Sequence, residues 1–288
     1  CSSDLKRGIE DCSEEKVKTR QPIQEYFHGK FRHLSLHGMT AYQHDTVVPY
    51  SGSPQSKKEQ VATMFDRIAL KYDFLNRFLS AGIDRYWRKK AIQELEKSKP
   101  QKILDVATGT GDMAILTYRR CKPEQIIGID ISEGMLKIGQ KKIAKLLLVN
   151  SIRLEKGDSE AINYPDGTFD AVTVAFGVRN FEQLDKGLQE IYRVLKPGGK
   201  IVVLEFSKPQ GILFKKIYGF YLQTIAPKAG GWISTHPDAY QYLHHSVNVF
   251  PEGQTFLHIL AQTGFQETSL RPLSLGICTI YCGIKKEY

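Results

Sequence analysis

The residues best able to do chemistry lie in one stretch, residues 102–114, where a short apolar run is followed by glycines and acids. The run contains Asp105, the glycines are Gly109 and Gly111, and helix-forming residues start after Asp112. This is the outline of a strand, a tight turn and a helix N-terminus, whose backbone N–H groups can hold a nucleoside-type cofactor. An ordinary strand-to-helix turn has the same outline, so the loop alone does not decide.

Polar residues also follow the later strand-like runs. Asp130 ends the second run about 20 residues beyond the loop, where a carboxylate can accept hydrogen bonds from both ribose hydroxyls of a cofactor. Asp158 and Ser159 follow the third run, where either could meet an adenine amino group, and Ala175 ends the fourth. A tight turn at residues 196–199 precedes the fifth run.

These residues leave two cofactors to choose between. Asp130 suits a nicotinamide cofactor as well as S-adenosylmethionine. Four features together favour S-adenosylmethionine: Asp105, Asp158 with Ser159, Ala175 and the turn at residues 196–199, although that turn is at least as well explained as a plain helix-to-strand connection. A purely structural role is also open for three of these acids. Asp105 could cap local backbone groups, and Asp112 and Asp158 could be solvated residues of a loop or helix start.

The composition excludes several classes of protein. Hydrophobic residues make up 41% of the chain and charged residues 25%, which is ordinary for a globular protein, and no apolar run has the length of a membrane span. The net charge of +9 comes without a block of lysine or arginine, so we expect no nucleic-acid partner. The five cysteines form no Cys-x-x-Cys pair and no complete zinc ligand set; we predict reduced thiols, no metal and a cytoplasmic location.

Strand-like and helical segments alternate from residue 102 onward. We predict strands over 102–106, 125–129, 151–155, 169–175, 200–206, 265–272 and 276–284, and helices over 112–120, 132–149 and 181–195. Such alternation with apolar strands indicates an α/β fold, a parallel sheet covered on both faces. The last two strands are too close in sequence for a parallel crossover, so they form an antiparallel hairpin and the sheet is mixed.

Two helical segments precede the first strand. One spans 57–79, with an expected break near 71–73, and the other spans 84–97, with Asp84 as N-cap. Together they form either a lid over the cofactor or structural cladding. We expect residues 57–288 to form the folded domain. Residues 1–56 are then a disordered extension, or partly residues encoded upstream of a native start at Met39.

An insertion over 208–264 interrupts the alternation before the last helix, which we predict over 251–262. Residues 211–227 are rich in aromatic and aliphatic side chains. They form either an internal packing helix, the usual meaning of an apolar stripe, or a surface for a greasy substrate or a membrane. His244 and His245 lie in the same insertion and are either bases or, as we prefer, solvated residues.

Four segments closely resemble the menaquinone/ubiquinone biosynthesis C-methyltransferase family. They are residues 103–112, 176–181 (Phe-Gly-Val-Arg-Asn-Phe), 192–209 and 64–73. The resemblance implies the class I methyltransferase fold, a Rossmann-like sheet of seven strands with the last one antiparallel. It also implies transfer of the methyl group of S-adenosylmethionine to a ring carbon of demethylmenaquinol, with a ubiquinone-precursor quinol as a further acceptor.

The resemblance also assigns residues to the donor. Thr110 and Asp130 contact it, and Asp158 with Ser159 lies by its adenine. Ala175 stands where the family often has serine, so a main-chain contact survives while a hydroxyl bond is lost. The predicted donor site is completed by Tyr72, Asp105, Gly109, Gly111 and Ile131.

Arg179 and Asn180 are the residues that we expect to face the acceptor ring. The nucleophile must be the electron-rich hydroquinone, so the enzyme must align a ring carbon and stabilise a developing phenolate. Because a guanidinium keeps its proton in proteins, we assign Arg179 to stabilise phenolate or to orient a water that takes the ring proton. Asn180 would fix the ring oxygen, and Asp112 is a second candidate for orienting the water.

Because the quinol substrate is lipid-soluble, the protein could contact the inner face of the cytoplasmic membrane peripherally. A homodimer is a separate possibility. Other functions fit less well. Methyltransferases of exocyclic base nitrogens commonly carry an Asn/Asp-Pro-Pro-aromatic run after strand four, where this chain has Ala-Phe-Gly-Val-Arg-Asn. A dehydrogenase would bind a nicotinamide cofactor, and a binding protein without catalysis would take the donor but transfer no methyl group.

Overall fold

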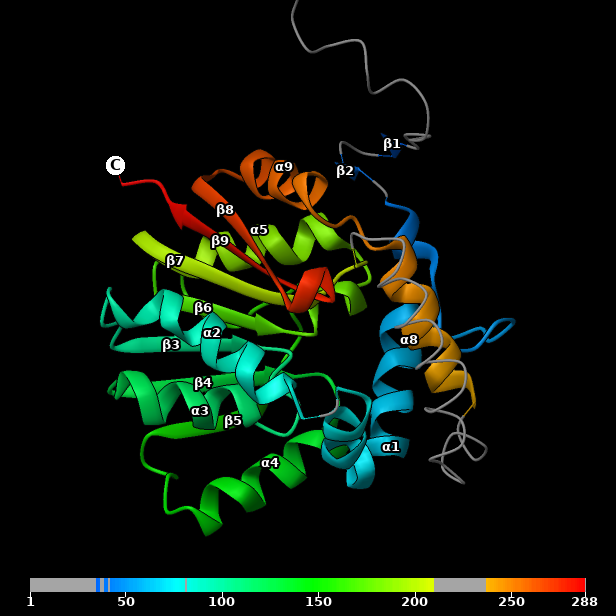
Figure 1. Ribbon diagram of the computed structural model, residues 1–288, viewed down its shortest axis with the longest axis horizontal. Coiled ribbons are helices and arrows are strands. Elements are labelled where there is room, and N and C mark those ends of the chain that lie inside the picture. Colours follow the sequence, from blue (N-terminus) through cyan, green and yellow to red (C-terminus); the bar gives the residue numbers. More distant parts are fainter. Residues whose placement is uncertain (1–34, 37–38, 41, 81, 210–236, 288) are drawn as a thin grey trace, which may run out of the picture. The chain divides into compact units, whose positions relative to one another are not determined.

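The chain from residue 102 onward is built around a sheet of seven strands (Figure 1). The structure, a computed structural model, describes residues 35–36, 39–40, 42–80, 82–209 and 237–287. The strand order is β5-β4-β3-β6-β7-β9-β8. The strands are β3 (Lys102–Val106), β4 (Gln125–Asp130), β5 (Ile152–Lys156), β6 (Phe169–Ala175), β7 (Leu195–Phe206), β8 (Phe265–Leu273) and β9 (Cys278–Lys285).

The strand directions confirm the mixed sheet. Strands β3 to β7 run parallel to one another, and β9 pairs antiparallel with both β7 and β8. The short turn η4 (Ser274–Gly276) makes the predicted hairpin between β8 and β9. The chain runs from β3 outward to β5 and then returns to β6 on the other side of β3. The carboxyl ends of β3 and β6 therefore meet at a switch point, where open α/β sheets bind ligands.

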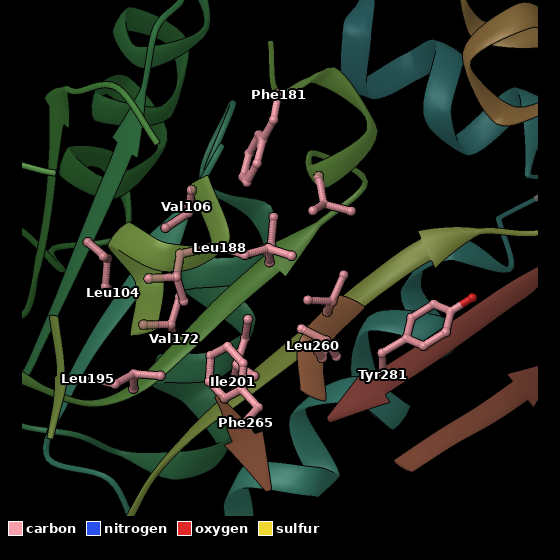
Figure 2. Close-up of a cluster of buried hydrophobic side chains, with 14 of the residues drawn as sticks. Leu104, Val106, Val172, Phe181, Leu188, Leu195, Ile201, Leu260, Phe265 and Tyr281 are labelled. Atoms are coloured by element: carbon pink, nitrogen blue, oxygen red, sulfur yellow. The ribbon is translucent and has the colours of Figure 1, made fainter. Parts of the chain in front are cut away.

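Successive strand residues point to opposite faces of the sheet, and apolar residues occur on both, so helices cover both faces. Ile103 packs with buried residues of α2, α3 and α4, whereas Leu104 packs with residues of α5 and α9 (Figure 2 shows the second cluster). The helices are α1 (Lys57–Leu79), α2 (Asp84–Glu96), α3 (Asp112–Cys121), α4 (Glu133–Lys145), α5 (Leu184–Val194), α8 (Pro237–Val249) and α9 (Gln254–Thr263).

Helices α1 and α8 pack together through Val61, Met64 and Tyr242, and Figure 1 shows them side by side. The remaining elements are short: β1 (Ser35–Leu36) paired with β2 (Met39–Thr40), η1 (Gln43–Thr46) and η2 (Val178–Asn180).

Two expectations about the first helices are wrong. α1 is one unbroken helix of 23 residues, started by a capping box between Ser56 and Glu59. The expected break near residues 71–73 does not occur, since the helix contains neither proline nor glycine. The N-cap of α2 is Ile83 rather than Asp84, whose carboxylate instead accepts a hydrogen bond from the Ser80 hydroxyl at 3.0 Å.

The helix predicted over 132–149 is shorter than expected. α4 ends at Lys145, and Leu147 then adopts a positive φ of 58°. The apolar segment over 211–227 lies outside the described residues, as do Cys1 and Cys12. None of the helices in the described part of the chain combines the length and apolar character needed to cross a membrane.

Candidate active site

A buried carboxylate shapes the loop between β3 and α3. Asp105 accepts hydrogen bonds from the hydroxyls of Thr108 at 2.6 Å and Thr173 at 2.5 Å. Burial raises the pKa of Asp105 to about 6, and the two hydroxyls partly offset that rise. Within the loop, Gly109 and Gly111 have φ of 57° and 77°, a conformation that favours glycine. Asp105 thus organises the loop from beneath it.

Asp130 connects this loop to the end of β4. Its Oδ2 atom accepts a hydrogen bond from the backbone N–H of Gly109 at 2.7 Å, and its Oδ1 atom accepts one from Ser132 at 2.9 Å. Burial raises the pKa of Asp130 to about 6, although these backbone hydrogen bonds act in the opposite direction. A carboxylate has about four acceptor sites, so Asp130 can also accept bonds from two ribose hydroxyls.

A cleft, partly open to solvent, lies at the carboxyl ends of β3, β4 and β6. The structure brings eight of the predicted site residues to its lining: Tyr72, Gly109, Asp130, Ile131, Asp158, Ser159, Ala175 and Asn180. The other predicted residues do not line it: Asp105, Thr110, Gly111, Asp112 and Arg179.

One wall of the cleft comes from α1, through Lys58, Val61, Phe65 and Tyr72. The Lys58 ammonium pairs with the carboxylate of Asp158 at 2.5 Å and with that of Glu160 at 3.3 Å. Of the two roles left open for the N-terminal helices, these contacts favour a lid over the cleft. The other oxygen of Asp158 accepts the backbone N–H of Glu160 at 2.9 Å, so the loop after β5 is firmly held.

Phe176, Gly177 and Asn180, which follow β6, also line the cleft. The Asn180 side-chain oxygen accepts a hydrogen bond from the hydroxyl of Tyr242 in α8 at 3.2 Å. Burial raises the pKa of Tyr242 far above its usual value, so this hydroxyl stays protonated and remains a donor. His244 and His245 are exposed on the same helix.

Arg179 does not line the cleft. Its Nη1 atom lies 2.6 Å from the carboxylate of Glu205 and donates to the Phe176 carbonyl at 2.6 Å. The Arg179 side chain is 6% exposed and that of Glu205 is fully buried, so the pair is closed off from water. The structure therefore places Asn180, but not Arg179, where a side chain can meet a ligand in the cleft.

Thr110 and Asp112 belong to a second polar network that joins three helices. The Lys142 ammonium of α4 contacts Asp73 at 2.5 Å, Asp112 at 2.7 Å and the Thr110 hydroxyl at 2.9 Å. The Thr110 hydroxyl in turn donates to Asp73 of α1 at 2.6 Å. Although burial opposes it, the Lys142 charge lowers the pKa of Asp112. This network ties α1 to the glycine loop.

Several residues of the site were not predicted. Glu205 ends an apolar strand, and a charge in such a position is a signal for a buried partner. Nothing in the sequence marks Lys58, Glu160 or Tyr242, because their partners lie far away along the chain. Glu160 is buried and accepts the backbone N–H groups of residues 182 and 183 at 2.7 and 3.0 Å.

Comparison with known proteins decides the family. Residues 53–285 match the model of the ubiE/COQ5 methyltransferase family. The chain belongs to this family. A demethylmenaquinone methyltransferase of Bacteroides fragilis is 46% identical over 244 residues, which cover 85% of this chain and 99% of the relative. The ubiquinone/menaquinone biosynthesis C-methyltransferase UbiE of Geobacter sulfurreducens is 47% identical over 230 residues, 80% of this chain and 90% of the relative.

Solved structures show the same fold at low sequence identity. An S-adenosylmethionine-dependent methyltransferase of Thermotoga maritima, described as a possible histamine N-methyltransferase, superimposes with a TM-score of 0.54 at 19% identity. It covers 78% of this chain and 99% of its own. The [4+2]-cyclase SpnF superimposes with a TM-score of 0.55 at 18% identity, covering 80% of this chain and 97% of its own. The ubiE/COQ5 member thus has the class I, Rossmann-like methyltransferase fold.

The cofactor of this methyltransferase is S-adenosylmethionine, and the cleft fits it. Asp130 offers a carboxylate at the end of β4, and Ile131 and Met135 beside it offer apolar surface. At Gly109, a Cβ atom would come within 3.3 Å of Met135, so a side chain there would narrow the cleft. The adenosine would lie against these residues, with Asp158 and Ser159 beside its adenine ring.

Proposed function

We propose that this methyltransferase methylates a ring carbon of demethylmenaquinol. One observation carries the proposal: a single cleft joins the donor residues Asp130 and Asp158 to Asn180 and Phe176. A methyl donor and a planar ring can therefore meet inside it. The names of the Bacteroides and Geobacter relatives supply the acceptor, and the second name makes a ubiquinone-precursor quinol the alternative.

When bound, S-adenosylmethionine supplies an electrophilic methyl group on its sulfonium. The residues of the chain do the rest by positioning. Asp130 and Gly109 hold the ribose, and the Phe176 ring gives the acceptor an apolar surface to lie on. Tyr242 donates to the Asn180 oxygen, and no acceptor in the described part of the chain bonds to the Asn180 amide nitrogen, so this nitrogen can donate to the ring oxygen of the acceptor. A hydrogen bond there stabilises developing phenolate.

Arg179 takes a different part in this proposal from the one expected from the sequence. Its guanidinium is neutralised by Glu205 and bound to the Phe176 carbonyl, so it holds the turn that carries Asn180. Arg179 is a positioning residue. Asp112 is likewise bound to Lys142 and lies outside the lining, so water in the cleft is oriented by other groups.

Contact with a membrane follows from the acceptor, which dissolves in lipid. Exposed apolar side chains of α1 and of the start of α2, called the apolar patch below, support it: Leu70, Phe74, Ile83 and Tyr86. Exposed basic residues lie on the same segments: Lys71, Arg77, Arg85 and Lys89. The exposed acid nearby, Asp66, is held by hydrogen bonds from the Ser132 hydroxyl and the Gly134 backbone N–H. Apolar side chains accompanied by positive charge suit the surface of an anionic bilayer. We assign the patch to peripheral contact with such a bilayer.

The choice of acceptor is tested by competition. Demethylmenaquinol and a demethylated ubiquinol precursor with the same isoprenoid tail are supplied together, with labelled S-adenosylmethionine. We expect label in the menaquinol product first. Preferential labelling of the benzoquinol would overturn the naphthoquinol assignment and leave methyl transfer to a quinol intact.

A further inference from the structure

Arg88 of α2 is a buried cation whose hydrogen-bonding groups are not all used. The residue is 7% exposed, and no acceptor in the described part of the chain bonds to its Nε or Nη1 atom. The Asp84 carboxylate lies 4.0 Å from Nη1, too far for a hydrogen bond, and is already bonded to Ser80. A buried guanidinium in this state favours binding an anion, because unpaired buried donors are costly.

The position of Arg88 relates it to the cleft. Its Cζ atom lies 5.1 Å from the centre of the Phe176 ring, which lines the cleft. Its charge also acts on the carboxyl groups of Asp105 and Asp112 and on the hydroxyl of Tyr72, another lining residue. These groups belong to β3, α3 and α1. Arg88 does not itself line the cleft, but it contacts Phe176, which does.

We propose that Arg88 binds the α-carboxylate of the amino-acid portion of the methyl donor. The donor carries one anionic group, and its adenosine is directed toward Asp130 and Asp158. The amino-acid portion then extends past the glycine loop toward Phe176 and Arg88. A guanidinium offers a fork of N–H groups that matches a carboxylate, and such charge-assisted bonds are roughly twice as strong as neutral ones. The proposal rests on the donor site and is independent of which quinol is methylated.

Two ligands separate this role from a structural one. S-adenosylhomocysteine contains the carboxylate, and 5′-methylthioadenosine shares the adenosine and the sulfur but lacks the amino-acid portion. Calorimetry on Arg88→Gln should show about 10- to 100-fold weaker binding of S-adenosylhomocysteine, the usual effect of losing a bond to a charged group. Binding of 5′-methylthioadenosine should stay within about twofold. Arg88→Lys, which keeps the charge, should recover part of the loss.

Asp130→Ala is the matched control, since it should weaken both ligands through the ribose that they share. Equal weakening of both ligands by Arg88→Gln, or no weakening of either, would overturn the proposal. So would unchanged affinity for both with a raised KM for the quinol, which would assign Arg88 to the phenolate of the acceptor. If Arg88→Gln does not fold, the wild-type protein decides: decarboxylated S-adenosylmethionine should bind at least about tenfold more weakly than S-adenosylmethionine, and equal affinity would contradict the assignment.

Discussion

At the scale of single residues, the donor site depends most on Asp130. Its carboxylate meets Gly109 and Ser132 within the chain and is available to the ribose. The pKa of Asp130 is raised by burial to about 6. Protonation removes the charge and part of the acceptor capacity, so donor affinity should fall as the pH drops through about 6.

Calorimetry with S-adenosylhomocysteine between pH 5 and 8 measures this dependence. Asp130→Asn should bind about 1–3 kcal/mol more weakly at pH 7.5 and lose the pH dependence below 7. The variant retains Asp105, whose pKa is also about 6. A slope that persists in Asp130→Asn would therefore move the titration to Asp105 and contradict the ribose role of Asp130.

The buried pair of Arg179 and Glu205 calls for a double variant. Removing one partner leaves an uncompensated buried charge, so Arg179→Met should lower the free energy of unfolding by about 3–5 kcal/mol. Arg179→Met combined with Glu205→Gln should regain most of that stability, as chemical denaturation would show. Turnover should stay low in the double variant, because the turn that carries Asn180 has lost its bond to the Phe176 carbonyl. Recovered turnover together with stability would show that Arg179 has no positioning role.

Single residues also mark where sequence reasoning succeeds. The position of Asp130 beside the glycine loop was predictable, because it ends the strand that follows the loop; its contact with the ribose stays a prediction. The roles of Arg179 and Glu205 were not predictable, since an ion pair across 26 positions leaves no local pattern. A polar residue at a strand end can point into a cleft or beneath it, and only packing decides which.

At the scale of elements, the strands follow from their apolar runs and agree with the structure to within a few residues. The exception is β7, which starts at Leu195, five positions before the predicted residue 200. The break expected in α1 near residues 71–73 was wrong. Asp73 bonds to Lys142 and Thr110, so this polar residue serves tertiary contacts within a continuous helix.

The contact of η1 with the segment after α8 contains a buried histidine, which should make the free energy of unfolding depend on pH. His44 is fully buried and packs edge-on against Phe250. Burial, with the nearby Lys57 charge, lowers the pKa of His44 from 6.5 to about 3. The unfolded chain binds this proton more readily, so stability is lost as the pH falls below about 6.5.

His44→Phe keeps an aromatic ring and removes the proton site. Between pH 7 and pH 5 the wild type should lose about 2 kcal/mol more stability than His44→Phe, from the unfolded-state titration alone. Urea unfolding at the two pH values measures the difference. Equal acid sensitivity of the two proteins would show that His44 becomes protonated in the folded state.

At the scale of the whole molecule, one face of α1 lines the donor cleft, and other residues of the same helix carry the apolar patch of Leu70 and Phe74. Burying these side chains in a bilayer interface is worth about 1.5–3 kcal/mol each, with further attraction from the basic residues. The patch was not predicted from the sequence, where the two N-terminal helices were expected to form a lid or structural cladding. The aromatic segment over 211–227, the surface considered from the sequence, lies outside the described residues.

Vesicle flotation tests the patch. The wild type should float with anionic vesicles, less with zwitterionic ones, and less at high salt. Leu70→Glu with Phe74→Glu should reduce flotation at least about tenfold while S-adenosylhomocysteine binds normally. Leu147→Glu, at a leucine that is 88% exposed after α4, is the control and should float as the wild type does. Equal flotation of the patch variant and the control would contradict the assignment.

The central claim is that this cleft transfers a methyl group to the carbon of a reduced ring. The most direct measurement incubates the protein with methyl-labelled S-adenosylmethionine and demethylmenaquinone, either reduced to the quinol or kept oxidised, and locates the label by mass spectrometry. We predict one labelled methyl on a ring carbon with the quinol and none with the quinone, because only the quinol ring is nucleophilic. Label on a ring oxygen, or equal labelling of the oxidised quinone, would contradict the account.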